Sequence, residues 1–409
     1  MMIVGIDDTD SLNGMCTTYL AHLVCEKFKA SAPPRLVRLN PNIPYRTRGN
    51  GAVAISLDEP VDVIDEVVDL VRQRSHMQEP NTNPGVAFIL DEHEQDLTSL
   101  HDLYLSSVSR EVTLSEAVKA GDDAGAMSYK FNNGRGLIGA LSAIGWTLSG
   151  DHTYELIAYR KQENLGTKRR LDEASVFRMN EGLYPQVFDS VDPETHQVLI
   201  TPAGPDPVFC GIRGISEVAV RQAWDTIMPL EDIDSVRVFI TNQATDDHIR
   251  TKRILDIAAY DCVKVSGTVA GDPRTGNGGH VFIELADESA SMDLAAYEPT
   301  GGLRDIVRSL IPGDALDAYG STSKYERTLN LEKIHVTSLH EKIVTIPPKC
   351  CGKNMTSQGT GKGFKCKKCG SRRTEDAQTR KTLDRGIEAI AYEVPPRSRR
   401  HLSKPLSRY

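Results

Sequence analysis

The sequence predicts a multidomain α+β protein, with an α/β domain first, a ferredoxin-like α/β layer second and a small OB-fold β-barrel third. Three observations support this fold class. The 409 residues are too many for one typical domain and fit three or four. Strand and helix patterns alternate up to residue 240, whereas short alternating strands follow from residue 263. Four of the eight cysteines cluster between positions 350 and 369, which indicates a small metal-binding domain near the end of the chain.

The first ninety residues predict the order strand, helix, strand, strand, helix, strand. Four apolar runs predict the strands, at residues 2–6, 35–39, 51–57 and 86–90. Apolar side chains recur at helical spacing in two stretches between these runs, at residues 20–28 and 61–71. The charged residues 92–121 that follow predict helical pieces without evident chemistry.

Three carboxylates, Asp7, Asp8 and Asp10, directly follow the first predicted strand. Carboxylates in such a turn are hard oxygen ligands, suited to a Mg²⁺ ion that bridges phosphates. Thr17 and Thr18 fall in the first turn of the predicted helix, where free N–H groups and the helix dipole attract phosphate. A solvated acidic turn before a Ser/Thr-rich helix start is the alternative reading of this stretch alone.

Two loops combine arginine with glycine, a combination suited to anions. Arginine matches phosphate bidentately, and glycine lets the backbone approach an anion closely. The first loop spans residues 40–50, and the second is a Gly-Arg-Gly turn that opens a predicted apolar helix at 137–146. Ordinary surface turns are the alternative for either loop taken alone. The candidate anion ligands are Arg46, Arg48, Gly49, Asn50, Gly134 and Arg135, with Ser11 and Gly14 beside the acidic turn.

The middle of the chain predicts the ferredoxin-like layer. Short apolar runs predict its strands, at residues 154–159, 198–200, 208–212 and 236–240. Ser216 suits the N-cap of a helix that precedes the last of these strands. Residues 164–179 are polar with mixed charge and predict no element, and residues 184–192 predict a proline-containing loop.

Short alternating strands between residues 263 and 336 predict a closed barrel. There are five such strands, at residues 263–269, 280–285, 292–297, 315–321 and 329–336. A predicted helix at 302–310 falls between the third and fourth strands, and this arrangement matches an OB-fold. OB-folds commonly bind single-stranded or looped nucleic acid. Another kind of small β-barrel is the alternative.

Two groups of side chains raise a metal hypothesis. Cys366 and Cys369 have the CxxC spacing of a zinc knuckle, and Cys350 and Cys351 precede them. The other group, at residues 246–248, is Asp-Asp-His. Three adjacent loop residues rarely converge on one ion, so a solvated or capping loop is favoured there.

The net charge of −8 conceals an asymmetry. Residues 350–409 carry fifteen Lys/Arg against five Asp/Glu, a charge of +10, so the rest of the chain carries −18. A basic end on an acidic body is common where the partner is a polyanion, and a merely soluble basic tail has the same composition. No apolar run approaches the ~20 residues of a membrane span, and no basic-then-apolar leader opens the chain. With isolated cysteines rather than a disulfide framework, this predicts a cytoplasmic protein without a membrane partner.

The opening stretch GIDDTDSLNGMCTTYLA resembles the start of the archaeal 2-agmatinylcytidine synthetases, the family that modifies the wobble cytidine of a minor isoleucine tRNA. Further blocks are similar to that family and occur in order from one end of the chain to the other. They are RLNPNIPYRTRGNGA, NTNPG, GRGLIGAL, ELIAYR, FITNQATDDH, GGHVFIE, YEPT, NLEKI and RRHLSKPL. A series of this length is far more specific than any one motif.

The resemblance implies a domain order and a reaction. The domains are a kinase-like, ATP-dependent catalytic domain at 1–130 or extending to about residue 192, a ferredoxin-like domain at 131–255, an OB-fold at 256–340, and a zinc ribbon with a basic tail at 341–409. The reaction is that of a C–N bond-forming ligase, which replaces the C2 oxo group of the wobble cytidine with agmatine while ATP ends as AMP and pyrophosphate. The C2 oxygen is a poor leaving group until it is phosphorylated, and the agmatine amine can then displace it. The residues that contact agmatine and the oligomeric state stay open.

The resemblance also assigns roles to the candidate residues. The three carboxylates would serve Mg²⁺ and phosphate chemistry, and Thr17 would be the phosphorylated threonine, with Thr18 as the alternative. Arg46, Arg48, Asn50 and Arg135 would hold phosphates or RNA.

The zinc ribbon departs from the family pattern. That pattern has a second CxxC about fifteen residues before the first, but Pro348 stands here where its first cysteine is expected, before Cys351. The fourth zinc ligand is Cys350, a water or nothing, and a ribbon that folds without zinc is the alternative.

Two other functions remain at this point: a non-catalytic RNA-binding protein that uses the OB-fold and ribbon, and another ATP-dependent RNA ligase. The acidic turn argues against the first, because a pure binder of polyanions has no use for three carboxylates beside an anion site.

Overall fold

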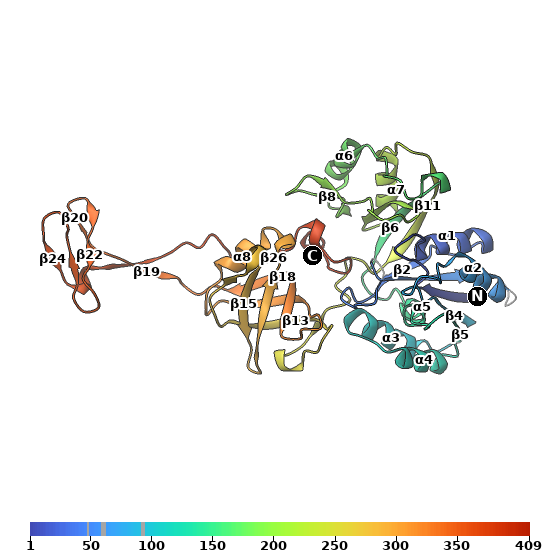
Figure 1. Ribbon diagram of the computed structural model, residues 1–409, viewed down its shortest axis with the longest axis horizontal. Helices are drawn as coiled ribbons and strands as arrows, with labels where there is room; N and C mark the ends of the chain where they lie inside the picture. Colours follow the sequence, from blue (N-terminus) through green and yellow to red (C-terminus); the bar gives the residue numbers. More distant parts are fainter. Residues whose placement is uncertain (47–48, 59–62, 91–94) are drawn as a thin grey trace.

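The computed structural model describes residues 1–46, 49–58, 63–90 and 95–409. Three bodies follow one another along its length: a large α/β body, a small β-barrel, and a ribbon domain on a narrow two-stranded stalk (Figure 1). No helix among these residues is both long and apolar enough to cross a membrane. The predicted multidomain α+β architecture is confirmed.

One nine-stranded sheet runs through the α/β body in the order β5-β4-β1-β3-β2-β11-β6-β10-β7. Its first half follows the predicted order, with β1 (Met2–Asp7), α1 (Thr17–Phe28), β2 (Arg35–Arg38), β3 (Gly51–Leu57), α2 (Val63–Arg74) and β4 (Gly85–Leu90). Positions 61–62 of the predicted second helix lie outside the described residues. The edge strand β5 (Met127–Lys130) has no apolar run that could have predicted it.

The second half of the sheet has the same order of elements. These are β6 (Thr153–Arg160), α6 (Glu173–Leu183), β7 (Val187–Phe188), β10 (Val208–Gly214), α7 (Glu217–Thr226) and β11 (Ile233–Thr241). The spatial order of the four strands is also the same in both halves. Along the sheet, the first half reads β4-β1-β3-β2 and the second reads β11-β6-β10-β7, which in each half is the fourth, first, third and second strand of the chain. The halves join where β2 and β11 pair in parallel.

Two local predictions in the second half were wrong, and one helix was not predicted. Helix α6 begins inside residues 164–179, for which no element was predicted. The predicted loop at 184–192 contains β7 and the short strand β8 (Val191–Asp192), and the predicted strand at 198–200 shrinks to β9 (Gln197–Val198). These elements are short or polar, so hydrophobic periodicity does not mark them. Ser216 caps α7 as predicted, because its hydroxyl accepts a hydrogen bond from Ala219 N at 3.2 Å.

Helices cover both faces of the first half of the sheet. Leu20 of α1 and Val67 of α2 belong to the apolar core on one face. On the other face pack α3 (Thr98–Ser109), α4 (Leu114–Asp123) and α5 (Gly136–Gly145). Helix α5 lies so close to β1 that a Cβ at Gly5 would be 2.1 Å from the carbonyl oxygen of Ala140.

The barrel agrees closely with its prediction. It contains β13 (Cys262–Val269), β15 (Val281–Ala286), β16 (Ser291–Ala296), α8 (Leu303–Ser309), β17 (Ala315–Ser321) and β18 (Thr328–Ser338). The five strands close on themselves, since β13 pairs with both β17 and β15. Short strands add to its edges, namely β12 (Arg250–Thr251), β14 (Arg274–Thr275) and β26 (Ala391–Glu393).

The ribbon domain is inserted between the barrel and the end of the chain. Its stalk is the antiparallel pair β19 (Ile343–Ile346) and β25 (Thr379–Thr382). The ribbon contains β20 (Lys349–Cys350), β21 (Lys353–Asn354), β22 (Thr356–Ser357), β23 (Phe364–Lys365) and β24 (Arg372–Arg373). Its small core is formed by Met355, Phe364 and Cys366. Figure 1 shows the ribbon standing away from the barrel.

The last residues, 394–409, are not a free basic tail but return to the α/β body as a strap (the C-terminal strap). Arg397 pairs with Asp192 at 2.8 Å, and Lys404 pairs with Asp151 at 2.8 Å. Leu402 is buried in the core that holds α3 and α5. The cations of the strap are therefore largely used in ion pairs within the chain, whereas those of the ribbon remain exposed.

Candidate active site

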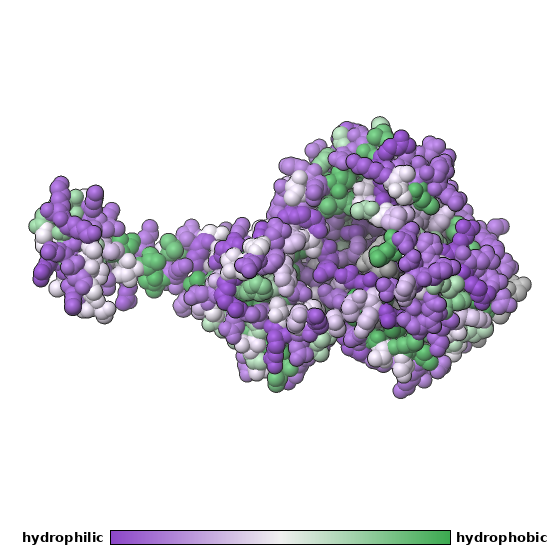
Figure 2. All heavy atoms as spheres, in the orientation of Figure 1, coloured by the Kyte–Doolittle hydropathy of each residue, from purple (hydrophilic) through white to green (hydrophobic). Residues whose placement is uncertain are grey.

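A cavity of about 700 Å³ lies where the two halves of the sheet meet. Its walls come from the ends of β1 and α1, from β2, β6 and β10, from the loop before β3, and from the C-terminal strap. Figure 2 shows a mostly hydrophilic surface that is hollowed between the part carrying α6 and α7 and the part carrying α3 and α4. The cavity thus uses both halves of the sheet.

The predicted carboxylates stand at one end of this cavity. Asp7 ends β1, and its Oδ1 accepts a hydrogen bond from Asp8 N at 2.7 Å. Asp8 has a left-handed backbone (φ 56°), and its Oδ2 accepts a hydrogen bond from Asn83 N at 3.1 Å. Burial, followed by repulsion from Asp8, raises the pKa of Asp7 well above its usual value. Burial likewise raises the pKa of Asp8 to about 7.

Helix α5 confines the Asp7 carboxylate. A Cβ at Gly139 would lie 1.9 Å from Asp7 Oδ2, and a Cβ at Gly136 would lie 2.7 Å from the Asp7 carbonyl oxygen. The Gly-Arg-Gly turn therefore brings the start of α5 directly against the acidic turn, as glycine permits. Arg135 lines the same cavity, and its guanidinium lies over the ring of Tyr45 at 4.2 Å.

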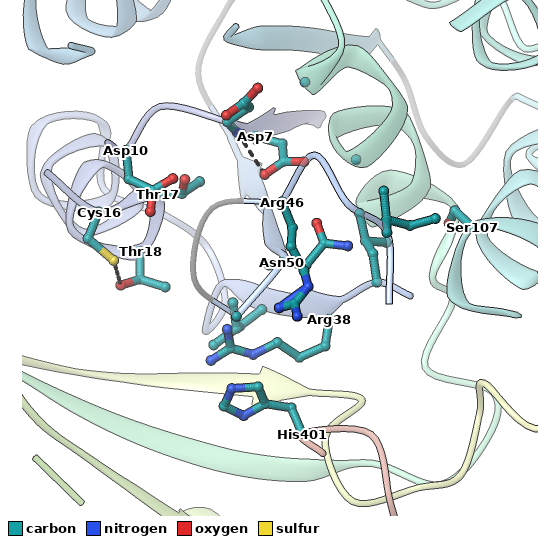
Figure 3. A pocket seen from close by; sticks show the side chains of 18 of the residues that line it. Asp7, Asp10, Cys16, Thr17, Thr18, Arg38, Arg46, Asn50, Ser107 and His401 are labelled. Carbon is teal, nitrogen blue, oxygen red and sulfur yellow. Dashed lines mark hydrogen bonds between the residues drawn. The ribbon is translucent and has the colours of Figure 1, made fainter. Parts of the chain in front are cut away.

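Both candidate threonines line the cavity at the start of α1 (Figure 3). Thr17 Oγ1 lies 3.1 Å from the hydroxyl of Thr9, which donates to it. Thr18 Oγ1 lies 3.0 Å from Cys16 Sγ. Cys16 provides no side-chain cap for the helix, so the N–H groups of the first turn are not satisfied in that way.

Some of the predicted anion ligands line the cavity, and others do not. Arg46, Gly49, Asn50 and Arg135 line the cavity, whereas Arg48 lies outside the described residues. Ser11, Gly14 and Gly134 do not line it. Ser11 instead contacts His76 Nδ1 at 2.9 Å and pairs with the Gly14 backbone, so it shapes the turn. Gly134 closes a turn with φ 73°.

Four further cavity residues come from distant segments and were not predicted, namely Arg38, Glu155, Arg213 and His401. Glu155 is only 5% exposed and accepts a hydrogen bond from Gln243 at 2.5 Å. The sequence holds a weak signal for three of them: they stand in the blocks RLNPN, ELIAYR and RRHLSKPL. Arg213 has none.

The side chains of residues 246–248 point to different partners. Asp246 pairs with Lys333 at 2.7 Å, the Tyr104 hydroxyl donates to Asp247 at 2.6 Å, and His248 contacts Glu332 at 3.0 Å. The loop therefore joins the α/β body to the barrel. The preference for a capping loop over a metal site agrees with this geometry.

The four C-terminal cysteines converge. Their Sγ atoms all lie within 4.8 Å of one another, with Cys350 3.9 Å from Cys351 and 3.5 Å from Cys369. Four thiolates around zinc are about 3.8 Å apart, given Zn–S bonds of about 2.3 Å. Cys351 has a left-handed backbone (φ 50°), the kind of distorted turn that adjacent ligands require. The geometry fits zinc, with Cys350 in the fourth position.

The acidic turn differs from this cysteine site. Among residues 1–46, 49–58, 63–90 and 95–409, the cysteines are the one group of three or more side chains close enough to share an ion directly. Asp7, Asp8 and Asp10 are more widely spaced. This fits a Mg²⁺ site, because Mg²⁺ usually binds one or two carboxylates and keeps waters and phosphates as its other ligands.

Comparison with known proteins covers nearly the whole chain. Three family models match: the TiaS TCKD domain over residues 3–133, the TiaS FLD domain over 134–248 and the TiaS C-terminal zinc ribbon domain over 347–387. The isoleucine-tRNA 2-agmatinylcytidine synthetase TiaS of Pyrococcus horikoshii is 43% identical over 99% of this chain and 97% of its own. The protein of the same name from Archaeoglobus fulgidus is 42% identical, again over 99% and 97%.

Solved structures agree with these matches. A complex of TiaS with its isoleucine tRNA and ATP is 40% identical, with a TM-score of 0.91 over 100% of this chain and 97% of that one. A complex of TiaS with the same tRNA, AMPCPP and agmatine is 38% identical, with a TM-score of 0.88 and the same coverage. This chain therefore belongs to the TiaS family.

Proposed function

We propose that this protein forms 2-agmatinylcytidine at the wobble cytidine of a minor isoleucine tRNA, using ATP and agmatine. ATP is cleaved by water to AMP and pyrophosphate, and the pyrophosphate transfers one phosphoryl group to the C2 oxygen of the cytidine and leaves as phosphate. The agmatine amine then displaces the phosphorylated oxygen, which departs as a second phosphate. The observation that carries this proposal is the cavity, in which carboxylates, hydroxyls and guanidinium groups meet within a chain that matches TiaS proteins over its full length. A cytoplasmic location is part of the proposal, since that is where tRNA is modified.

The residues around the acidic turn would divide the work of phosphate chemistry. Asp7, Asp8 and Asp10 would hold Mg²⁺, which when bound neutralises phosphate charge. Thr17 or Thr18 would carry the phosphorylated hydroxyl at the start of α1, where helix N–H groups favour phosphate. Arg135 at the start of α5 and Arg46 and Asn50 in the neighbouring loop would hold phosphates or RNA. Arg48, outside the described residues, shares this proposed role.

Supporting evidence for the finer fold assignments comes from the order of elements. The second half of the sheet, from β6 to β11, has the β-α-β-β-α-β order of a ferredoxin-like domain. The closed five-stranded barrel with α8 between its third and fourth strands supports an OB-fold. We keep the proposed domains as a kinase-like domain at 1–130, the ferredoxin-like domain at 131–255, the OB-fold at 256–340 and the ribbon with the strap at 341–409.

A non-catalytic RNA-binding function is not favoured. It would leave unexplained why half-buried carboxylates with raised pKa values line a cavity beside a helix start that suits anions. Another ATP-dependent RNA ligase would share the cavity, but one of the matching solved structures is a complex with agmatine, which favours agmatine as the second substrate.

Dependence of AMP formation on both substrates tests the proposal. We expect AMP to form at full rate only with agmatine and a transcript of the minor isoleucine tRNA. A transcript with uridine at the wobble position is the matched control and should give little AMP. Equal AMP formation with both transcripts would contradict the proposed substrate.

A further inference from the structure

The cavity has two ends of opposite charge. Asp7 and its neighbouring carboxylates stand at one end, whereas Arg38 and His401 lie together at the other, beyond Arg46 and Asn50 (Figure 3). Arg213 of β10 also lines the cavity at this second end, beside Glu155. We call Arg38 and Arg213 together the guanidinium end.

Both arginines of the guanidinium end have hydrogen-bond donors without an acceptor among the described residues. The Arg213 side chain donates no hydrogen bond to any residue that the structure describes. Its contacts to Glu155 Oε1 and Asp189 Oδ2 are both 3.7 Å, beyond hydrogen-bond distance. Arg38 donates from Nη2 to Glu155 Oε2 at 3.4 Å. The buried Nε atoms of both arginines lack a partner within the described part of the chain. Buried donors without acceptors cost free energy, so their retention beside a cavity points to a ligand.

The carboxylates at this end are shared between guanidinium groups. Glu155 contacts both Arg38 and Arg213. Asp189, the second carboxylate near Arg213, pairs more closely with Arg399 of the C-terminal strap. Neither carboxylate therefore holds Arg213 in a close pair.

The pKa of His401 indicates a positive electrostatic potential at this end of the cavity. Burial, and then the nearby Arg38 and Arg213, lower its pKa well below the usual value. Its Nδ1 lies 3.1 Å from Gln243 Oε1, which holds the neutral ring in place. A field that disfavours a proton on this imidazole favours an anion in the adjacent space.

Glycine keeps space open at the guanidinium end. A Cβ at Gly49 would lie 2.6 Å from Arg38 Nη1 and 3.0 Å from His401 Nε2. Any side chain at this position would therefore intrude between the two groups.

We propose that Arg38 and Arg213 form an anion subsite that receives the oxygens of a phosphoryl group. A guanidinium fork matches two phosphoryl oxygens at once, and the unused donors of both arginines would supply such contacts. The subsite lies across the cavity from the acidic turn, so one phosphate-bearing substrate could be held by a cation at one end and by arginine at the other. The inference rests on the proposed function, because that function brings two phosphate-bearing substrates, ATP and tRNA, to this cavity.

Arg213 allows a clean test, because its side chain makes no hydrogen bond to the described residues that its removal would break. The variants are Arg213→Gln and Arg213→Lys in the full chain, and Arg221→Gln is the matched control, since Arg221 pairs with Glu217 on the exposed surface of α7. Titration calorimetry would measure binding of inorganic pyrophosphate, of ATP with Mg²⁺, and of the tRNA transcript in separate runs. Thermal unfolding would accompany each variant.

We expect Arg213→Gln to leave the unfolding midpoint close to that of the parent and to weaken a phosphate ligand roughly tenfold to a hundredfold, as for a lost charge-assisted hydrogen bond. Arg213→Lys keeps the charge but not the fork and should fall between. Weaker binding of pyrophosphate and ATP alone identifies the nucleotide as the source of the phosphoryl group, and weaker binding of tRNA alone identifies the RNA backbone. Binding of all three ligands equal to that of Arg221→Gln overturns the subsite. If the parent itself binds neither ATP nor tRNA, the proposed function fails instead.

Discussion

The two halves of the nine-stranded sheet have the same order of elements and the same order of strands, yet the ends of their first strands differ in chemistry. In the first half, β1 ends at Asp7 and runs into carboxylates that line the cavity. In the second half, β6 ends at Arg160, whose guanidinium pairs with Glu231 at 2.6 Å, both side chains being almost fully buried. The first end lines the large cavity, whereas the charged side chains at the second end are buried against each other.

This difference teaches that the shared strand order places side chains but does not assign their function. Both halves contribute to the cavity, the first through the acidic turn and the second through Glu155 and Arg213. The Arg160 guanidinium at the end of β6 finds its hydrogen-bond acceptors within the protein. Besides pairing with Glu231, it donates to the Thr167 carbonyl oxygen at 2.8 Å. The acidic turn keeps carboxylates with raised pKa values instead. Mutations at the two strand ends should therefore separate activity from stability.

The largest effect is expected at the acidic turn. Asp8→Asn should reduce tRNA-dependent AMP formation roughly a hundredfold to a thousandfold, as when a preorganised charge is removed from an active site. Its unfolding midpoint should not fall, because Asp8 is held by a backbone N–H and no cation of the chain pairs with it at salt-bridge distance among the described residues. Asp69→Asn, at an exposed ion pair on α2, is the matched control. Near-normal turnover by Asp8→Asn would remove the proposed metal role.

The opposite result is expected at the end of β6. Arg160→Met should lower the free energy of unfolding by about 3–5 kcal/mol, because it leaves Glu231 buried without its partner. The adjacent Lys161→Met is the control, since Lys161 and Asp232 are exposed, and should change stability by no more than about 0.5 kcal/mol. Denaturant unfolding measures both. Equal effects of the two substitutions would refute a structural role for this strand end.

A smaller effect, on tRNA affinity, is expected when the ribbon is removed, since it lies outside both halves of the sheet. Residues 347–378 can be replaced by Asn-Gly, because Ile346 and Thr379 face each other across the stalk. This removes eight Lys/Arg and two Asp/Glu, and tRNA affinity should fall at least about tenfold with a shallower salt dependence. ATP affinity should persist, since the ribbon supplies no residue that lines the cavity. Truncation after residue 387 is the contrasting variant, because it keeps the ribbon but removes the C-terminal strap with His401, and it should weaken ATP binding.

The smallest effect is expected in the pH dependence of stability. The Asp8 carboxyl has a pKa of about 7 in the folded protein against an ordinary value of 3.8, so the folded protein holds a proton between these values that the unfolded chain has lost. Metal-free stability therefore falls as pH rises through this window and levels off above about pH 7. Mg²⁺ competes with that proton, so the rise in Tm on adding Mg²⁺ should grow from pH 5 to pH 7. A pH-independent rise would contradict this linkage, and Asp8→Asn should show a weaker pH dependence than the parent.

Periodic parts of the fold could be predicted from the sequence. The βαββαβ order of the first ninety residues and the five barrel strands follow apolar runs that one buried face requires. The edge strand β5 and the short strands β7, β8 and β9 could not be predicted, because two to four residues carry no period. The strap was misread for a different reason: its basic composition suggests RNA, but the carboxylates that pair with Arg397 and Arg399 lie some two hundred positions earlier.

Much the same limit applies to the site. Asp7, Asp8 and the threonines could be identified because strand end, turn and helix start are consecutive in the chain. Arg38, Glu155, Arg213 and His401 meet through the pairing of β2 with β11, of β11 with β6 and of β6 with β10, and through the return of the strap. No local pattern encodes that meeting. The fourth zinc ligand is an intermediate case, since Cys350 was the nearest thiol and the structure places it with the other three.

Mass analysis of nucleosides tests the central claim most directly. The minor isoleucine tRNA transcript would be incubated with the protein, ATP and agmatine, digested to nucleosides and compared with a reaction that lacks agmatine. The account predicts a new nucleoside whose mass is that of cytidine plus agmatine less one water, at the expense of a single cytidine per tRNA. Unmodified cytidine after ATP has been consumed, or a cytidine adduct that does not contain agmatine, would contradict it.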